Sequence, residues 1–469
     1  MSERISVVSH SPHPFFVTML ASVAAMAGFL FGFDTAVISG AVIAIQNYFQ
    51  IGDWLVGLAV SLALLGSAIG AFFAGPIADR IGRVRSMQIA AVLFLVSAIG
   101  SGLPVTVWDF IWWRVLGGVA VGAASVIAPA YIAEVAPAHL RGRLGSLQQL
   151  AIVSGIFVAQ LSNYFIAGRA GGAEPKWLGG FEAWKWMFWV EALPAVLYGV
   201  GAMFIPESPR YLVAKGDEVG ATAILKRILG GDVAAKIVEI RESLKRTTRP
   251  SLKDIAGPAW GLLPIVWIGI ILSMLQQLVG INVIFYYGAT LWRIIGFTEA
   301  DALKITMITG ITNIVTTLIA IATVDKFGRK PLLLIGSIGM AVSLGTMAVL
   351  FGTATVDASG NPDLSKSAGL AALIAANAYV FFFGASWGPV VWVMLGEMFS
   401  NRIRGSALAV AAAMQWVANF AISTTFPPMA KGLGLGGSYL IYAFFAAVSF
   451  VFVWRVVSET KGKELEQVK

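Results

Sequence analysis

The chain has 469 residues, of which 58% are hydrophobic and none is cysteine. Its mean hydropathy of +0.80 is too apolar for a soluble globular protein and predicts a polytopic membrane protein. The lack of cysteine excludes disulfides and thiol chemistry. The three histidines, His10, His13 and His139, lie in polar segments, which argues against a metal site or histidine catalysis.

Apolar runs of roughly 20 residues predict transmembrane helices, and the chain contains twelve. They span residues 16–45, 54–78, 86–105, 108–132, 143–167, 184–205, 260–291, 303–323, 331–352, 368–398, 406–427 and 437–457. An even number of crossings places both termini on the same side of the membrane.

Most of the 33 lysines and arginines fall in loops on the side of the two termini. The opposite side carries Arg169, Lys176, Lys185, Arg293, Lys304, Lys366 and Lys431. Since cytoplasmic loops are rich in Lys and Arg, we expect a cell (plasma) membrane protein with both termini in the cytoplasm. The net charge of +8 is then explained by topology, without a nucleic-acid partner.

A long polar segment, 207–258, divides the predicted helices into two sets of six. The sequence therefore predicts an all-α membrane protein with two pseudo-symmetric six-helix halves, 1–206 and 259–457, and a short tail, 458–469. The segment between the halves is interpreted as a small cytoplasmic helical domain, with a plain linker as the alternative.

Acid and base pairs recur in the same order at the cytoplasmic helix ends of both halves, which indicates two parallel repeats. The residues are Asp79, Arg83, Glu134, Arg141, Glu207 and Arg210 in the first half, and Asp325, Arg329, Glu397, Arg404 and Glu459 in the second. We interpret them as an ion-pair network that holds the halves together when the cytoplasmic side is closed. Ordinary interfacial charge with helix capping is the alternative.

A polar cluster interrupts the apolar run 260–291. Its members are Gln276, Gln277, Asn282, Tyr286 and Tyr287. On a straight helix Gln277 and Asn282 would point roughly 140° apart, so a break near Gly280 is predicted to bring both onto one ligand, as in transporter binding sites. The cluster favours a site for a neutral polyhydroxyl solute; amides that only join helices are the alternative.

Other helices carry further residues suited to a carbohydrate. These are Gln149, Asn313, Trp392, Gln415 and Trp416. Amides bind hydroxyls, and a flat indole covers the C–H side of a sugar ring. The sequence Gly388-Pro389 predicts a kink in the helix that contains Trp392.

Asp34 and Arg114 lie within predicted helices, where ionisable groups are costly and usually pair or serve function. We expect them to pair, and separation of the pair would let Asp34 carry a proton across the membrane. A static structural pair is the alternative. Glu191 lies near the outer end of its predicted helix, where an interfacial position is nearly as good an interpretation.

These motifs together resemble the sugar porter family of the major facilitator superfamily over nearly the whole chain. The resemblance rests on residues 79–83, 134–141, 206–210, 276–287, 325–329 and 459–462, and is greatest for bacterial hexose and xylose transporters, the cyanobacterial glucose type in particular. It implies that Gln149, Gln276, Gln277, Asn282, Trp392, Gln415 and Trp416 line the sugar site, with Phe31 and Asn313 as further candidates. It also implies that Asp34 is the proton-coupling residue and Arg114 its partner.

The predicted function is transport of a monosaccharide, glucose or another hexose, by alternating access in symport with protons. Tyr286 and Tyr287 are the predicted outer gate, and the monomer is the expected functional unit. The chain has no P-loop for ATP and no catalytic constellation, so we expect neither an enzyme nor a cofactor. A uniporter with the same site is the first alternative, and a non-transporting sugar sensor is the second.

Overall fold

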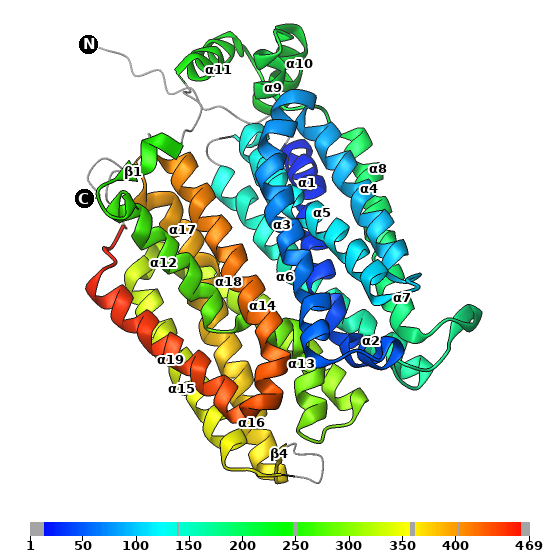
Figure 1. The fold of residues 1–469 in the computed structure, drawn as a ribbon. Helices are drawn as coiled ribbons and strands as arrows, with labels where there is room; N and C mark the ends of the chain where they lie inside the picture. Colours follow the sequence, from blue (N-terminus) through cyan, green and yellow to red (C-terminus); the bar gives the residue numbers. More distant parts are fainter. Residues whose placement is uncertain (1–13, 138–139, 247–251, 357–361, 401–402, 461–469) are drawn as a thin grey trace.

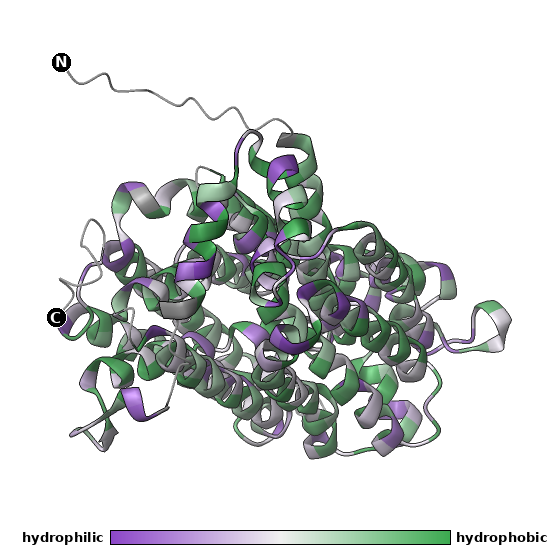
Figure 2. Cartoon of the chain, turned by 90° about the horizontal axis from the view of Figure 1, so that it is seen from above, coloured by the Kyte–Doolittle hydropathy of each residue, from purple (hydrophilic) through white to green (hydrophobic). Residues whose placement is uncertain are grey.

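A computed structural model describes residues 14–137, 140–246, 252–356, 362–400 and 403–460. Within these residues twelve helical segments are long and apolar enough to cross a membrane. Figure 1 shows them as two helical bundles side by side, and Figure 2, seen from above, shows mostly hydrophobic ribbon in both. The predicted fold class is confirmed: an all-α membrane protein with two six-helix halves.

The first half is built around α3 packed on α5 and α1 packed on α6. Its elements are α1 (Pro14–Val37), η1 (Ile38–Gly40), α2 (Val42–Phe49), α3 (Asp53–Ile81), α4 (Arg83–Ser101), α5 (Val107–Val135), α6 (Arg141–Ala170), η2 (Leu178–Gly180), α7 (Ala183–Trp189) and α8 (Ala192–Phe204).

The polar middle segment is helical. It contains α9 (Pro209–Ala214), α10 (Glu218–Leu229), α11 (Ala234–Arg246) and η3 (Leu252–Ile255). The helices share a small apolar core, and they sit over the first half in Figure 1. The Arg227 guanidinium of α10 lies 4.1 Å from the centre of the Phe16 ring, near the N-terminal start of α1. The helices of this segment therefore contact the first half.

The second half repeats the helix order of the first and adds two short hairpins. Its elements are β1 (Ala256–Gly257), β2 (Gly261–Leu262), α12 (Pro264–Leu278), α13 (Ile281–Ile294), α14 (Glu299–Phe327), α15 (Arg329–Gly352), β3 (Thr355–Val356), β4 (Pro362–Asp363), α16 (Lys366–Phe382), η4 (Phe383–Trp387), α17 (Gly388–Met398), α18 (Arg404–Gly432) and α19 (Gly434–Arg455). Strand β1 pairs with β2 and β3 with β4, both antiparallel.

Four of the membrane segments are broken. The breaks predicted near Gly280 and before Pro389 are confirmed, the second as a single π-helical stretch, η4. The predicted segments 16–45 and 184–205 are present as the spans Phe15–Gly40 and Ala183–Phe204, each with an irregular turn inside it. The first is interrupted at η1, where the Asn163 amide donates 2.9 Å to the freed Val37 carbonyl. The second is interrupted before Pro194, which has no N–H to continue the helix.

Candidate functional site

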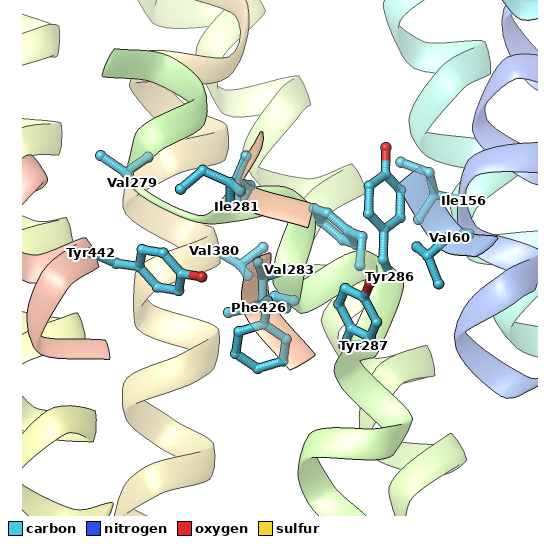
Figure 3. Close-up of a cluster of buried hydrophobic side chains, with 14 of the residues drawn as sticks. Val60, Ile156, Val279, Ile281, Val283, Tyr286, Tyr287, Val380, Phe426 and Tyr442 are labelled. Atoms are coloured by element: carbon cyan, nitrogen blue, oxygen red, sulfur yellow. The ribbon is translucent and has the colours of Figure 1, made fainter. Parts of the chain in front are cut away.

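The break in the seventh membrane segment has a clear backbone cause. Gly280 lies between α12 and α13 with φ +83°, a left-handed conformation that glycine adopts without steric cost. A Cβ at this position would lie 2.7 Å from the Tyr442 ring. The Tyr379 hydroxyl donates 2.7 Å to the Val279 carbonyl and so partners a group that the break releases. Figure 3 shows Val279, Ile281 and Tyr442 around this point.

The break gathers the predicted amides into one hydrogen-bonded network. Asn282 Nδ2 donates 2.6 Å to Gln277 Oε1, and Gln277 Nε2 donates 3.4 Å to Gln276 Oε1. Gln415 Nε2, from α18, also donates to Gln276 Oε1. The buried Gln415 Oε1 has no partner among the described residues. The network therefore offers unused hydrogen-bonding capacity in the interior of the second half.

Backbone carbonyls at the end of the π-helical stretch η4 accept hydrogen bonds from this network. Gln276 Nε2 donates 2.7 Å to the Trp387 carbonyl and 3.0 Å to the Gly388 carbonyl. Asn313 approaches η4 at Gly384, where an added Cβ would lie 3.5 Å from Asn313 Oδ1. The irregular backbone at η4 thus offers carbonyls that Gln276 binds and, at Gly384, the space that lets Asn313 come close.

Two predicted sugar contacts are not joined to this network by any contact that the structure gives among the described residues. Trp392 lies on α17, and 45% of its surface is exposed. Gln149 is half-buried on α6. The neighbouring Gln148 is buried with both side-chain amide atoms unpartnered among the described residues. Gln148 was not among the residues predicted from the sequence, although a second amide in an apolar helix is a signal of the same kind.

Phe31 and Trp416 meet across the two halves. Their ring centroids are 6.2 Å apart, with the planes tilted by 38°. Both rings line a small cavity of about 20 Å³, together with Asp34, Arg114 and Tyr286. A cavity of this size holds about one water molecule. The aromatic candidates of the sugar site therefore adjoin the charged pair.

Asp34 and Arg114 pair as predicted, deep within the first half. Arg114 Nη1 lies 2.6 Å from Asp34 Oδ1, and Nη2 donates 3.0 Å to the Asp34 carbonyl. Both residues are buried, and the guanidinium also lies 5.5 Å from the Phe188 ring centre. Arg114 Nε has no partner among the described residues. Part of the hydrogen-bonding capacity of this buried pair is therefore unused, which makes the pair costly to bury.

Glu191 is a third charged residue of this cluster. It is 1% exposed, at the break between α7 and α8, so the interfacial interpretation was wrong. It interacts electrostatically with Asp34 and Arg114, and its Oε1 has no hydrogen-bond partner among the described residues. The break at Pro194, which the hydropathy pattern does not reveal, sets this carboxylate inside the bundle.

The two tyrosines lie on α13 where it meets the first half. Tyr287 donates 2.8 Å to the Ser423 carbonyl, and its ring centroid is 5.2 Å from that of Phe426. Tyr286 lies beside Val60 and Ile156 of the first half in Figure 3. Both side chains are buried, and α13 thereby joins the halves.

Further contacts join the halves toward the same end of the bundle. Ser61 and Thr424 share a buried 2.6 Å hydrogen bond. Lys431 lies 2.9 Å from Asp53. The backbone N–H of Ala173, in the loop after α6, donates 2.7 Å to Glu299 Oε1 at the start of α14. This end, away from the two termini, is therefore closed.

The predicted cytoplasmic charges form one arrangement in the first half. Arg83 binds Glu134 through Nε (3.1 Å) and Nη2 (3.0 Å), and lies 2.9 Å from Asp79. Glu207 accepts the backbone N–H groups of Arg83 (3.0 Å) and Val84 (3.1 Å), and so caps α4. Ser208 Oγ donates to the same Glu134 carboxylate.

The second half repeats the contacts that the first half makes through Glu134, Glu207 and Ser208. Arg329 binds Glu397 through Nε (3.0 Å) and Nη2 (2.7 Å). Glu459 accepts the N–H groups of Arg329 (3.1 Å) and Lys330 (2.9 Å), and Thr460 Oγ1 donates 2.6 Å to Glu397. Each of these pairs lies within its own half. Because Glu207 and Glu459 cap helices beside the ion pairs, charge pairing and helix capping occur together.

The remaining predicted network residues have other surroundings. Arg210 donates 3.3 Å to Ser243 in α11, and Arg404 Nη2 donates 3.1 Å to the Phe399 carbonyl. The side chains of Arg141 and Asp325 lie outside the part that the structure describes. A role of the whole set in joining the halves stays a prediction.

The fold and the site are typical of one class of protein, the twelve-helix membrane transporter with a polar cluster at a broken helix. A family model described as "Sugar (and other) transporter" matches residues 20–469. The chain is 64% identical over 454 residues to the "Glucose transport protein" of Synechocystis sp. (strain ATCC 27184 / PCC 6803 / Kazusa), with 97% of each chain covered. It is 40% identical to the "D-xylose-proton symporter" of Escherichia coli (strain K12), with 98% of this chain and 96% of that one covered.

Solved structures agree with the sequence relatives. The inward-open xylose transporter XylE from E. coli superimposes with a TM-score of 0.82 at 39% identity, over 96% of this chain and 99% of that one. The chain therefore belongs to the sugar transporter family of the major facilitator superfamily, and it transports a sugar across a membrane.

Proposed function

We propose that this protein carries glucose across the cell membrane in symport with protons, with both termini in the cytoplasm and the monomer as the working unit. The observation that carries the sugar site is the amide network of Gln276, Gln277, Asn282 and Gln415 at the Gly280 break. It supplies donors and acceptors for hydroxyls inside a membrane segment, where polar groups mark substrate paths. The glucose transport protein of Synechocystis supports glucose as the substrate.

The proposed site lies between this network and Trp416, which faces Phe31 of the other half. The amides would bind sugar hydroxyls, and the indole would cover the C–H face of the ring. Gln149, Asn313 and Trp392 complete the proposed lining on the remaining sides. A sugar held in this way contacts both halves, so its binding can favour their closure around it.

Proton coupling is assigned to Asp34. The Asp34–Arg114 pair adjoins Trp416 through the shared small cavity, so movement of the sugar site can disturb the pair. Release of Asp34 from Arg114 would let the carboxylate take up a proton, and re-formation of the pair would expel it. The proton-coupled xylose relative supports this assignment.

A uniporter with the same site is the second candidate. The short, buried contact between Arg114 and Asp34 favours it, because a pair that stays closed through the cycle exchanges no proton. Glu191 beside the pair argues for symport, because a second carboxylate can neutralise Arg114 when Asp34 is protonated.

We infer that the structure represents the inward-facing half of the cycle. The contacts between halves at Ser61–Thr424, Lys431–Asp53 and Ala173–Glu299 close the outer end. The arginine pairs at the cytoplasmic end stay within each half. In the outward-facing state the outer contacts would part, and the cytoplasmic charges would pair across the halves.

The test is uptake of labelled glucose into proteoliposomes, with and without an inward proton gradient, for wild type and Asp34→Asn. We expect wild type to accumulate glucose only with the gradient, and Asp34→Asn to retain counterflow without accumulation. Asp109→Asn, in the first turn of α5, is the matched carboxylate control and should accumulate glucose normally. Equilibration that ignores the gradient in wild type would establish the uniporter instead.

A further inference from the structure

A groove of about 540 Å³ lies on the first half, away from the sugar site. Its walls are single faces of three helices. They are Ser22, Ala25, Met26, Phe29 and Phe33 of α1; Leu147, Leu150, Ala151, Ser154 and Val158 of α6; and Val190, Leu193, Pro194 and Leu197 at and just before the start of α8. The spacing of three and four residues within each set places each set along one stripe of its helix.

The groove opens toward the bilayer. Leu193 is 66% and Leu197 53% exposed at its rim, and α8 lies at the outer edge of the first half in Figure 1. These residues belong to a membrane-spanning segment, so the surface that they expose meets lipid. The groove is therefore continuous with the lipid-facing surface of the protein.

The lining excludes a polar occupant. Its only hydrogen-bonding side chains are the hydroxyls of Ser22 and Ser154, and it contains no charged residue. A sugar or an ion placed here would lose its hydration without compensation. An acyl chain loses nothing, because it exchanges lipid neighbours for equally apolar side chains.

The groove lies in the hydrophobic middle of the membrane-spanning segments. Ser22 and Phe33 are eleven residues apart on α1, which corresponds to about 16 Å along the helix. They occupy the central part of the span Phe15–Gly40. This is the depth at which lipid tails lie, and the length of the groove suits part of one acyl chain.

The end of the groove at Phe33 and Val190 adjoins the buried charges. Phe33 precedes Asp34 in α1, and Val190 precedes Glu191 at the break between α7 and α8. An acyl chain that reaches Phe33 and Val190 completes the apolar wall around Asp34, Arg114 and Glu191. It keeps the local dielectric constant low, which strengthens the Asp34–Arg114 attraction.

We propose that this groove binds one acyl chain of a membrane phospholipid, and that the chain insulates the charge cluster from the membrane side. The lipid site is distinct from the sugar site. The proposal does not depend on which sugar is transported.

The test uses full-length protein in liposomes that contain a phospholipid with a photoactivatable diazirine in its acyl chain. After irradiation and digestion, mass spectrometry compares the label on α6 residues 147–158 with the label on α15. Val342 of α15 is 64% exposed and represents an ordinary lipid-facing surface. We expect the α6 segment, which contributes the back of the groove, to carry several-fold more label than α15.

Two variants fill the groove, Ser154→Trp and Ala151→Phe, and Val342→Trp is the matched control. We expect each filling variant to reduce the α6 label several-fold while the α15 label is unchanged, and sugar counterflow to report that the variant is folded. Equal labelling of α6 and α15 in wild type would overturn the proposal. So would α6 labelling that persists in a folded filling variant.

Discussion

Asn282 donates a 2.6 Å hydrogen bond to Gln277, although the two residues lie five positions apart in one membrane segment. On a continuous helix their side chains would diverge by roughly 140°. The left-handed Gly280 redirects α13 and makes the contact possible. Substitutions at the glycine and at the amides should therefore impair the same proposed sugar site, for different physical reasons.

Gly280→Ala should destabilise the protein by about 1–3 kcal/mol, because alanine is strained at φ +83° and its Cβ would meet the Tyr442 ring at 2.7 Å. The measurement is thermal unfolding in detergent. Gly345→Ala is the control, since an added Cβ there meets nothing within 4 Å and α15 is an ordinary helix. An unchanged melting temperature for Gly280→Ala would show that the break is not sterically required.

Gln277→Ala should weaken sugar binding about tenfold or more. It removes one amide that would bind a hydroxyl and leaves Asn282 without its acceptor, and each lost hydrogen bond costs about 0.5–1.5 kcal/mol. The half-saturation concentration for uptake measures this change. Trp392→Ala should act in the same direction through loss of the aromatic face.

Asn377→Ala is the matched amide control. Asn377 bonds with Thr312 and with the Leu373 carbonyl on α16, outside the network. Normal uptake in both Gln277→Ala and Trp392→Ala, at equal amounts of protein in the membrane, would refute the assignment of the sugar site.

The outer contacts between the halves should differ in strength according to their burial. Lys431 is 79% exposed, and exposed ion pairs contribute about 0–1 kcal/mol. Ser61 is buried with its partner Thr424. Thr424 keeps its hydrogen bond to the Phe420 carbonyl when Ser61 is removed, so the loss is that of one buried hydrogen bond, about 0.5–1.5 kcal/mol. Ser61→Ala should therefore open the outer side more than Lys431→Ala does.

The lack of cysteine makes this measurable with a single introduced thiol. Thr290 lines a small cavity at the outer end, so Thr290→Cys should react faster with an impermeant maleimide added outside when the halves part. Lys236→Ala, which removes an exposed pair with Glu239 in α11, should leave the rate unchanged. A larger effect of Lys431→Ala than of Ser61→Ala would contradict the burial argument.

Glu207→Gln and Glu459→Gln should destabilise their own halves by similar amounts, of the order of 1 kcal/mol each. Each carboxylate accepts two backbone N–H groups at the start of a helix, α4 and α15 respectively, and a third from the residue that follows it in the chain. Glutamine offers one acceptor oxygen in place of two. Unfolding curves in detergent measure the change, and a large difference between the two variants would show that the repeated geometry hides unequal roles.

Much of the fold was predictable because the relevant forces act locally along the chain. The apolar runs predict twelve crossings, since each segment must satisfy its own backbone in lipid. Gly280 and the sequence Gly388-Pro389 predict breaks, since a left-handed glycine and a proline act on the backbone where they stand. Pro194 carries the same signal, and the continuous apolar run around it masked the break that it causes.

The sequence by itself determined the membrane fold, the repeated halves and the chemistry available in the interior, because hydropathy, motif order and residue type do not depend on packing. It also indicated the Asp34–Arg114 pair, since two opposite charges in lipid have few other partners. Tertiary structure alone decided that Glu191 joins this pair, that Arg83 and Arg329 pair with glutamates of their own halves, and that contacts between the halves lie at the end away from the two termini. These features depend on which helix faces meet, and that is settled by the packing of segments far apart in the chain.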